Sequence, residues 1–374
     1  MTYESVDKLQ KALAEWVFHY TKDSKKAAGR ALGTLIEIIT YYLLKEWGLY
    51  KNISIETRLW EYANETLTHN VEYTLHRIQA EKELNLSEVS FPFSIKKIVK
   101  QAWDKKLFDW FALRNANIIE KGKIIRNNCV IWTNIDYILM SNIKKLEQNL
   151  IDITISKLSI KPFAMFECKR VGVEEWTKKW PQTIEKAKQW AYVARTVSSL
   201  QKFRDESGDT MWIISSWGSY NIKKYDELLD EVINSNDKNL IKNFVLTVGV
   251  VSNHGNWFTS DNPNKELIVL AQSYDWLIFL TDIGLSEFIS NLILDPKEEY
   301  KSIKEAFLAS YNWEKTSNQF TKIKMSYEAD KKLQKYFSQN IDKIESWFNI
   351  IAPKWKKLEL LKEQLAVLGT KEIL

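Results

Sequence analysis

The pattern of apolar and polar residues divides the amino-terminal part of the chain into helices followed by strands. Apolar residues recur at helical spacing in DKLQKALAEWVFHYT and again in GRALGTLIEIITYYLLKEWG. The second segment carries an apolar stripe from Leu32 to Leu43, and Gly48 is predicted to end this helix. Between residues 53 and 78 the pattern changes to the alternation typical of strands, in ISIETRLWEY and NVEYTLHRI.

The middle of the chain is predicted to mix helices with strands. A helix is expected over IKKIVKQAWDKKLFDWFALRN, a hairpin around Lys121 and Gly122, and strands in CVIWTNIDYILMS, LIDITIS and FAMFECK. A long amphipathic helix, QTIEKAKQWAYVARTVSSLQKF, and a buried strand, TMWIISS, follow. NFVLTVGVVS and ELIVLAQ are candidates to extend the sheet, and YDWLIFLTDIGLSEFISNLI is predicted to pack a helix on it. We therefore expect an α/β fold, a mixed β-sheet flanked by helices, with additional helical elements at both ends.

Composition narrows the class of protein. The chain has 374 residues, of which 45% are apolar, enough to form a substantial core. Only Cys129 and Cys168 are present and no signal-peptide pattern is seen, so we expect a cytoplasmic protein with reduced thiols. No apolar stretch approaches the roughly 20 residues that span a bilayer, so we expect no membrane partner. The formal net charge of +5 is too small to argue by itself for an anionic partner.

The segment FAMFECKR, residues 163–170, combines an apolar strand with a charged end. Because side chains alternate along a strand, Glu167 and Lys169 point to one face while Phe166 and Cys168 point to the other. Charges at the end of a buried strand need partners or a ligand. The pattern therefore predicts a functional acid and amine presented side by side, with the Cys168 thiol facing away from them.

An acid on a neighbouring strand is predicted to complete this site. LIDITIS and PFAMFEC can form an antiparallel hairpin with its turn in KLSIK, and that register places Asp152 opposite Glu167. Cross-strand Cβ atoms are roughly 5 Å apart, close enough for two carboxylates to share a divalent cation. Asp136, in TNIDYILMS, is the alternative first acid. Two acids with Lys169 suit Mg²⁺, because hard oxygen ligands hold the ion and the amine can orient or deprotonate water.

This order of residues resembles the PD-(D/E)xK nuclease superfamily. The matching residues are Asp152 or Asp136, followed by Glu167 and Lys169 on the next strand and then by a helix with a polar face. Isoleucine stands where the family pattern has Pro before the Asp. The resemblance covers about residues 29–216 and implies a restriction-endonuclease-like core.

Further site residues follow from the same resemblance. Many members place a supporting Glu on an early helix, which here corresponds to Glu37. The helix after the E-x-K strand often supplies a Gln or a basic residue near the scissile phosphate, which corresponds to Gln182, with Lys186 on the same polar face. A helix amino terminus attracts phosphate, which supports the position of Gln182. Arg170 is a further candidate for a phosphate contact.

The resemblance also implies an activity. A chain of this length without helicase or methyltransferase motifs is most like a type II restriction endonuclease. Such an enzyme is a homodimer that uses Mg²⁺ to cut double-stranded DNA at a specific sequence, leaves 5′-phosphate ends, and is paired with a separate methyltransferase. The alternatives are a structure-specific repair or junction nuclease of the same superfamily, and a noncatalytic DNA-binding protein.

No linker rich in Pro, Gly or Ser marks a domain boundary. We expect residues 1–295 to form the nuclease core with its amino-terminal helices. Residues 296–374 are expected to form a Lys-rich helical region that contacts DNA or a second subunit. The aromatic and Lys-rich residues at 95–115 and beyond 310 are candidates for DNA contact, although solvated helices often carry such lysines too.

Other catalytic patterns are absent from the sequence. It contains no HExxH, no paired CxxC, no G-x-S-x-G and no phosphate-binding glycine loop with lysine. The four histidines, His19, His69, His76 and His254, are scattered along the chain and are predicted to be structural or exposed.

Overall fold

The computed structural model describes most of the chain. The described residues are 6–61, 64–87, 89–102, 116–172, 193, 200–204, 206, 210–216, 219–242, 244–254, 270–311 and 319–371. Two predicted site residues, Gln182 and Lys186, lie outside these ranges, and Arg170 is described by its backbone alone.

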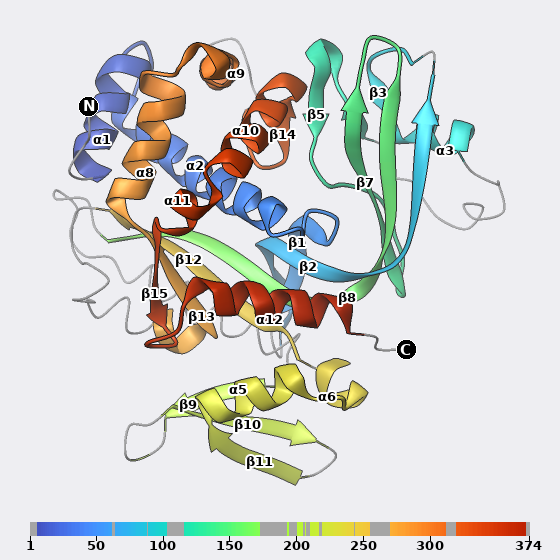
Figure 1. The fold of residues 1–374 in the computed structure, drawn as a ribbon, viewed down its shortest axis with the longest axis vertical. Helices are drawn as coiled ribbons and strands as arrows, with labels where there is room; N and C mark the ends of the chain where they lie inside the picture. The colour runs from blue at the N-terminus through green and yellow to red at the C-terminus, as the bar shows by residue number, and fades with distance from the viewer. Residues whose placement is uncertain are drawn as a thin grey trace.

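A mixed β-sheet with eight strands in the described part of the chain forms the centre of the molecule (Figure 1). Neighbouring strands β1, β2 and β8 are antiparallel, β8, β12 and β13 are parallel, and β15 is antiparallel to β13. These strands are β1 (Ile53–Glu61), β2 (Asn64–Leu86), β8 (Ile151–Gly172), β12 (Leu246–His254), β13 (Trp276–Leu280) and β15 (Phe348–Ala352). The predicted α/β class, a mixed sheet flanked by helices, is confirmed.

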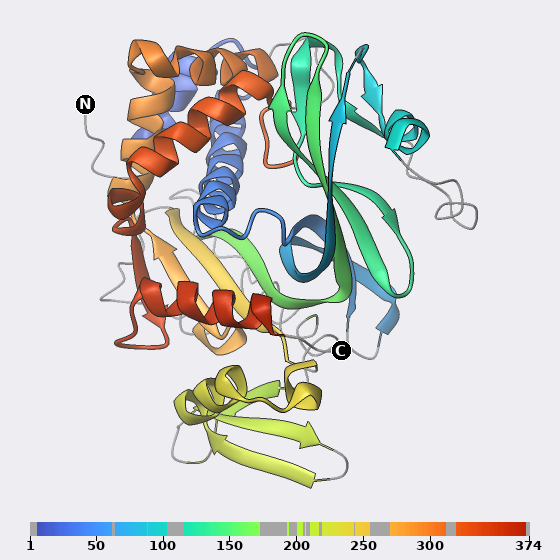
Figure 2. The ribbon, with the colours of Figure 1, turned by 45° about the vertical axis from the view of Figure 1, so that its right-hand side comes forward.

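Strand β8 is long and belongs to two parts of the molecule, the central sheet and a second lobe. One edge pairs with β2 from Ile151 to Phe166. The other edge pairs with β7 (Tyr137–Leu146) over residues 151–159 and with β12 over residues 164–172. Figures 1 and 2 show β2 and β8 curving together from the central sheet into a second lobe.

The predicted hairpin between LIDITIS and FAMFECK is therefore wrong, because both segments belong to β8. The expected turn, KLSIK, contains no Gly, Asn or Asp, the residues that tight hairpin turns favour. It stays extended because Lys157 and Leu158 pair with both β2 and β7. Asp152 is consequently not opposite Glu167.

Helix α2 (Ser24–Glu46) covers one face of the central sheet. It begins where the Asp23 side chain accepts a hydrogen bond from the backbone N–H of Lys26 at 2.9 Å. It ends before Gly48, whose φ of +79° is a conformation that glycine adopts without strain. The predicted stripe is buried and packs against the apolar residues of β2, β8 and β12, and its members are Leu32, Leu35, Ile36, Ile39 and Leu43.

The second lobe surrounds the far ends of β2 and β8. Strands β6 (Cys129–Thr133) and β7 extend the main sheet there, beside a four-stranded sheet of β3 (Phe93–Ser94), β4 (Asn117–Ile119), β5 (Ile124–Arg126) and β14 (Lys324–Ser326). The predicted hairpin at Lys121 and Gly122 is confirmed, since β4 and β5 are antiparallel and Gly122 has a φ of +76°. The predicted helix at residue 95 is α3 (Ile95–Ala102). The lobe has its own core of apolar side chains.

A third, three-stranded sheet consists of β9 (Leu200–Arg204), β10 (Thr210–Ser216) and β11 (Ser219–Lys224), followed by α5 (Tyr225–Asn234) and α6 (Lys238–Lys242). The predicted strand TMWIISS is confirmed as β10, but it lies outside the central sheet. Residues 200–203, predicted as the end of a helix, belong to β9 because they pair with β10. The described end of ELIVLAQ is helical, and YDWLIFL contains β13 before its helix.

The carboxy-terminal residues belong to the same core as the rest of the chain. Strand β15 extends the central sheet, and α10 (Tyr327–Gln339) packs on α2. One apolar cluster includes residues on both sides of position 295. The other helices are α1 (Val6–Ala12), α8 (Asp282–Ile289), α9 (Lys301–Ser310), α11 (Ile341–Glu345) and α12 (Leu358–Thr370). None of the helices in the described ranges is long and apolar enough to cross a membrane.

Candidate active site

Glu167 and Lys169 lie side by side near the end of β8, as predicted. The Lys169 Nζ is 2.7 Å from the Glu167 Oε1, and the two side chains are 18% and 12% exposed. Cys168, between them, packs toward the core, where its Sγ donates to the Thr40 Oγ1 at 3.4 Å. Burial raises the pKa of this thiol well above its usual value, so Cys168 is unsuited to act as a nucleophile.

Glu72 on β2 is the acid that lies next to Glu167. The β2–β8 ladder ends at the pair Tyr73 and Phe166, beyond which β2 pairs with β1 and β8 pairs with β12. At this end of the ladder the backbone N–H of Glu72 donates to the Glu167 Oε2 at 3.3 Å. Burial raises the pKa of the Glu72 carboxyl, and the charges of Glu37 and Glu167 raise it further, so the carboxyl groups of Glu72 and Glu167 lie near each other where the two strands part.

Glu37, predicted as the supporting acid, does point into this site from α2. Its backbone carbonyl accepts a hydrogen bond from the Tyr73 hydroxyl at 2.6 Å, which ties the helix to β2 beside Glu72. Its carboxylate lies 3.0 Å from the Nζ of Lys322.

Lys322 supplies a buried ammonium group to the same cluster. It comes from the segment before β14, and only 3% of the residue is exposed. Its Nζ lies 2.9 Å from the Glu72 Oε2, 3.0 Å from the Glu37 Oε2 and 3.5 Å from the Glu56 Oε1. One cation thus holds together carboxylates from α2, β1 and β2.

Glu56 reaches the cluster through an unusual backbone conformation. Its φ is +52°, in the left-handed region that side chains other than glycine rarely adopt, although it lies within β1. Strain of this kind persists where the surrounding structure enforces it, and it concentrates at functional sites. Here it accompanies a carboxylate held near Lys322.

The cluster contains four carboxylates and two ammonium groups, so acid is in excess. Burial, together with the nearby charge of Glu37, raises the pKa of Glu72 to about 8 despite the proximity of Lys322. Burial also raises the pKa of Glu37. For Lys322, burial alone would lower the pKa, but Glu72 and Glu37 outweigh that effect and raise it. Glu72 is therefore the acid that holds a proton near neutral pH, while Lys322 stays charged.

The structure places the two predicted aspartates away from this cluster. Asp152 lies at the opposite end of β8 from Glu167 and pairs with Asn85 and Lys145. Asp136 is exposed in the turn before β7, where its backbone N–H donates to the Asn134 Oδ1 at 2.9 Å. Neither can share a ligand with Glu167, because the hairpin register that would have joined them does not form.

Glu56, Glu72 and Lys322 are site residues that the sequence did not predict. A weak signal existed for Glu72, which stands inside the strand-like segment NVEYTLHRI, where an acid needs a partner. The sequence gave no signal for Lys322, because the lysine-rich segment around it is also typical of a solvated surface. His76 has the structural role predicted for it, since it is fully buried and its ring nitrogens form hydrogen bonds with the Ser159 carbonyl and the Thr74 hydroxyl.

The residues present match Mg²⁺ by chemical type. Carboxylate oxygens are the ligands that this ion prefers, and Glu37, Glu56, Glu72 and Glu167 supply them. In the described part of the chain, however, no group of three or more His, Cys, Asp or Glu is arranged to hold a metal ion. The Lys322 ammonium lies among three of the carboxylates. Lys322 therefore neutralises part of the acid in the cluster, whereas Glu167 is outside its reach and pairs with Lys169.

Comparison with known proteins found no matching family model, curated protein or solved structure.

Proposed function

We propose that this protein is a Mg²⁺-dependent deoxyribonuclease of the PD-(D/E)xK type that hydrolyses phosphodiester bonds. The observation that carries the proposal is the meeting of Glu72 with the Glu167–Lys169 pair where β2 and β8 part. Isolated E-x-K triplets are common, but a second acid delivered to the same point by a neighbouring antiparallel strand is much more specific.

The order of elements supports the same proposal. Glu37 comes from a helix that precedes the sheet, the first acid from β2, and the E-x-K residues from β8, its antiparallel neighbour. The resemblance implies this order of residues along the chain, with Glu72 in place of the expected Asp, but it puts the E-x-K residues on the next strand, whereas β3 to β7 lie between β2 and β8 here.

The residues of the cluster have two kinds of role in this proposal, binding the metal ion and orienting water or phosphate. Glu72 and Glu167 would hold Mg²⁺, with Glu37 and Glu56 as supporting carboxylates. A bound Mg²⁺ would polarise a phosphoryl oxygen and offset the charge that builds up on it. The Lys169 ammonium has three N–H donors and gives one to Glu167, which leaves two to orient water or a phosphate oxygen. The carboxylate of Glu167 fixes that orientation.

The more detailed proposal is a type II restriction endonuclease. It would be a cytoplasmic homodimer that makes sequence-specific double-strand cuts with 5′-phosphate ends, with a separate methyltransferase protecting the same site. This rests on the resemblance alone. A structure-specific nuclease would share the chemistry and differ in its substrate.

The deciding experiment incubates the protein with plasmid DNA and Mg²⁺ and maps any cut ends. Glu72→Gln and Lys169→Gln are each expected to lower the cleavage rate by about 100-fold to 1000-fold, because the first removes an oxygen ligand of Mg²⁺ and the second removes the ammonium that orients water or a phosphate oxygen. Asp152→Asn is the matched control. It changes an acid on β8, the strand that carries Lys169, but at the opposite end of that strand from the cluster. DNA binding, measured without divalent ions, should survive in all three variants.

The outcomes separate the alternatives. Discrete fragments indicate sequence-specific cutting, whereas cuts at branched or damaged DNA indicate a structure-specific enzyme. Binding without any Mg²⁺-dependent cleavage would mean a noncatalytic DNA-binding protein. Loss of cleavage in Asp152→Asn together with full activity in Glu72→Gln would overturn the site assignment.

A further inference from the structure

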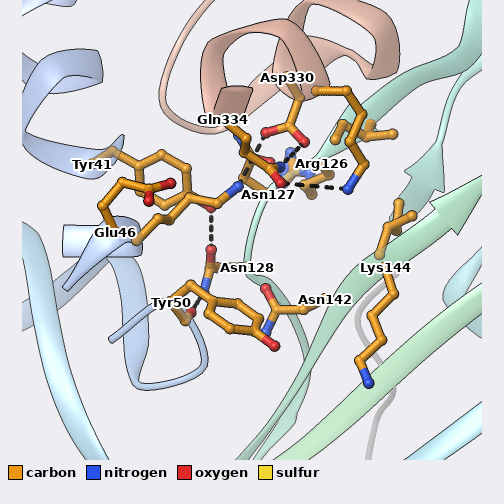
Figure 3. Close-up of a pocket in the computed structure, with 14 residues that line it drawn as sticks. Tyr41, Glu46, Tyr50, Arg126, Asn127, Asn128, Asn142, Lys144, Asp330 and Gln334 are labelled. Atoms are coloured by element: carbon orange, nitrogen blue, oxygen red, sulfur yellow. Dashed lines mark hydrogen bonds and ion pairs between the residues drawn. The ribbon is translucent and has the colours of Figure 1, made fainter. Parts of the chain in front are cut away.

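A polar pocket of about 320 Å³ lies outside the acidic cluster (Figure 3). Its walls are the carboxy-terminal half of α2, the segment that joins β5 to β6, strand β7, and α10. The volume falls in the range of pockets that hold small organic ligands. Amide, aromatic and cationic side chains dominate the lining, in contrast to the carboxylates of the candidate active site.

One buried donor in this pocket has no partner. The Asn142 side-chain Nδ2 makes no hydrogen bond within the described structure, although only 7% of the residue is exposed. A buried amide donor left unpaired is costly, and native proteins seldom keep one without a reason. Figure 3 shows the Asn142 amide facing the pocket near Tyr50 and Asn128. A ligand that offers a hydrogen-bond acceptor would satisfy it.

The residues that line the pocket near Asn142 are held in place by hydrogen bonds within the protein. The Asn128 Nδ2 donates to the carbonyls of Tyr50 at 2.6 Å and Ile53 at 2.8 Å, while its Oδ1 accepts from the Tyr41 hydroxyl at 2.5 Å. The Asp330 Oδ1 likewise accepts from the Tyr42 hydroxyl at 2.7 Å. These groups are satisfied by the protein, so the pocket is formed before any ligand enters.

The charges in the pocket favour an anion. Lining cations outnumber lining acids, and two of them are already paired, Lys45 with Asp330 and Lys144 with Glu83. Arg126 differs, since its guanidinium has no ion pair or hydrogen bond among the described residues. A free guanidinium beside a polar cavity is suited to bidentate binding of phosphate.

Two further groups suit the edge and face of a planar ring. The half-buried Glu46 carboxylate lines the pocket without an ion pair and can accept a hydrogen bond from an amino group. The Tyr50 ring also lines the pocket and offers an aromatic face for stacking. The pocket lining therefore combines four kinds of group: a hydrogen-bond donor, an acceptor, an aromatic face and a guanidinium, from Asn142, Glu46, Tyr50 and Arg126.

We propose that this pocket binds a nucleotide, with the phosphate on Arg126, the base edge on Asn142 and Glu46, and the ring against Tyr50. The nucleotide could come from two sources, a free nucleoside monophosphate or a residue turned out of a DNA strand. The pocket adjoins the acidic cluster, since the Asn127 Nδ2 donates to the Lys322 carbonyl at 3.1 Å. The inference goes beyond the proposed nuclease activity and does not depend on it.

Calorimetric titration with the nucleoside monophosphates, with inorganic phosphate alone as a comparison, tests the first source. A DNA duplex carrying 2-aminopurine, titrated in EDTA, tests the second, because the fluorescence of this base rises when it leaves the stack. Arg126→Met and Asn142→Leu are each expected to weaken binding at least 10-fold. Asn142→Leu removes the unpaired donor at nearly constant volume, so it should fold as well as the wild type. Lys121→Gln, on the exposed β4–β5 turn, is the matched control.

Each outcome either supports the nucleotide-binding proposal or overturns it. Mononucleotide binding that both variants weaken supports the proposal with a free ligand, and a fluorescence rise that both variants abolish supports it with a turned-out nucleotide. Phosphate binding as tight as nucleotide binding would overturn it, as would binding by neither probe or variants that match the wild type. Glu72→Gln should bind the probes normally, so failure of the nuclease proposal would be seen separately.

Discussion

The ionisation of Glu72 depends strongly on the fold. In the unfolded chain its pKa returns to the ordinary value of 4.5, whereas in the folded protein it is about 8. The folded state therefore holds the proton more tightly between these values. Its contribution to the free energy of unfolding is complete below about pH 4.5, declines as the pH rises, and is gone above about pH 8.

Glu72→Gln should remove this pH dependence, because the amide does not titrate. The wild-type free energy of unfolding should fall relative to that of the variant by up to about 1.4 kcal/mol per pH unit between pH 4.5 and 8. Urea unfolding of both proteins at several pH values measures the difference. His76 titrates in the opposite sense, since burial lowers its pKa to about 4, but it is present in both proteins and cancels. Parallel curves would contradict the raised pKa of Glu72.

At the scale of elements, the predictable features were those encoded by nearby residues. The α2 stripe and Gly48 follow from helical spacing, and the Glu167–Lys169 pair follows from alternation along a strand. The course of β8 does not, because KLSIK stays extended through pairing with β2 and β7, which are distant in the sequence. The wrong course of β8 then placed Asp152 beside Glu167 in the prediction, whereas the structure places Glu72 there.

The strained residue in β1 gives a prediction at this scale. Glu56→Gly relieves the left-handed conformation, whereas Glu56→Ala keeps it, and both remove the carboxylate. We expect the Gly variant to have a free energy of unfolding about 1 kcal/mol higher than that of the Ala variant. Thermal or urea unfolding compares them. At an ordinary strand position the order would be reversed, so a more stable Ala variant would show that Glu56 is not strained.

At the scale of the whole molecule, the carboxy-terminal region supplies the cation that the acidic cluster needs. Lys322→Met leaves three carboxylates without their counter-ion, and we expect it to lower the free energy of unfolding by about 3 kcal/mol. Ca²⁺ should stabilise this variant more than the wild type, because it can replace the lost charge. Urea unfolding with and without Ca²⁺ measures both effects.

Lys324→Met is the control for that experiment. Lys324 pairs with Glu120 at 2.5 Å, but both side chains are more than a fifth exposed, and pairs of this kind contribute about 0–1 kcal/mol. If the two variants lose equal stability and respond equally to Ca²⁺, Lys322 is not the counter-ion of the cluster. Lys322 could not have been found by local reasoning, since its partners are far from it in the sequence.

The continuous pairing of β2 with β8 has a consequence for how the protein could vary. The chain leaves β2 at Leu86 and enters β8 at Ile151, and these two residues are paired at the second lobe's end of the β2–β8 ladder. Such a lobe can be shortened, enlarged or exchanged between relatives while Glu72, Glu167 and Lys169 keep their places in the central sheet. Any exchange must preserve the pairing of β7 with β8 and of β5 with β14. It must also preserve the hydrogen bonds of Asn127 and Asn128, which join the lobe to the segment that carries Lys322 and to the residues after α2.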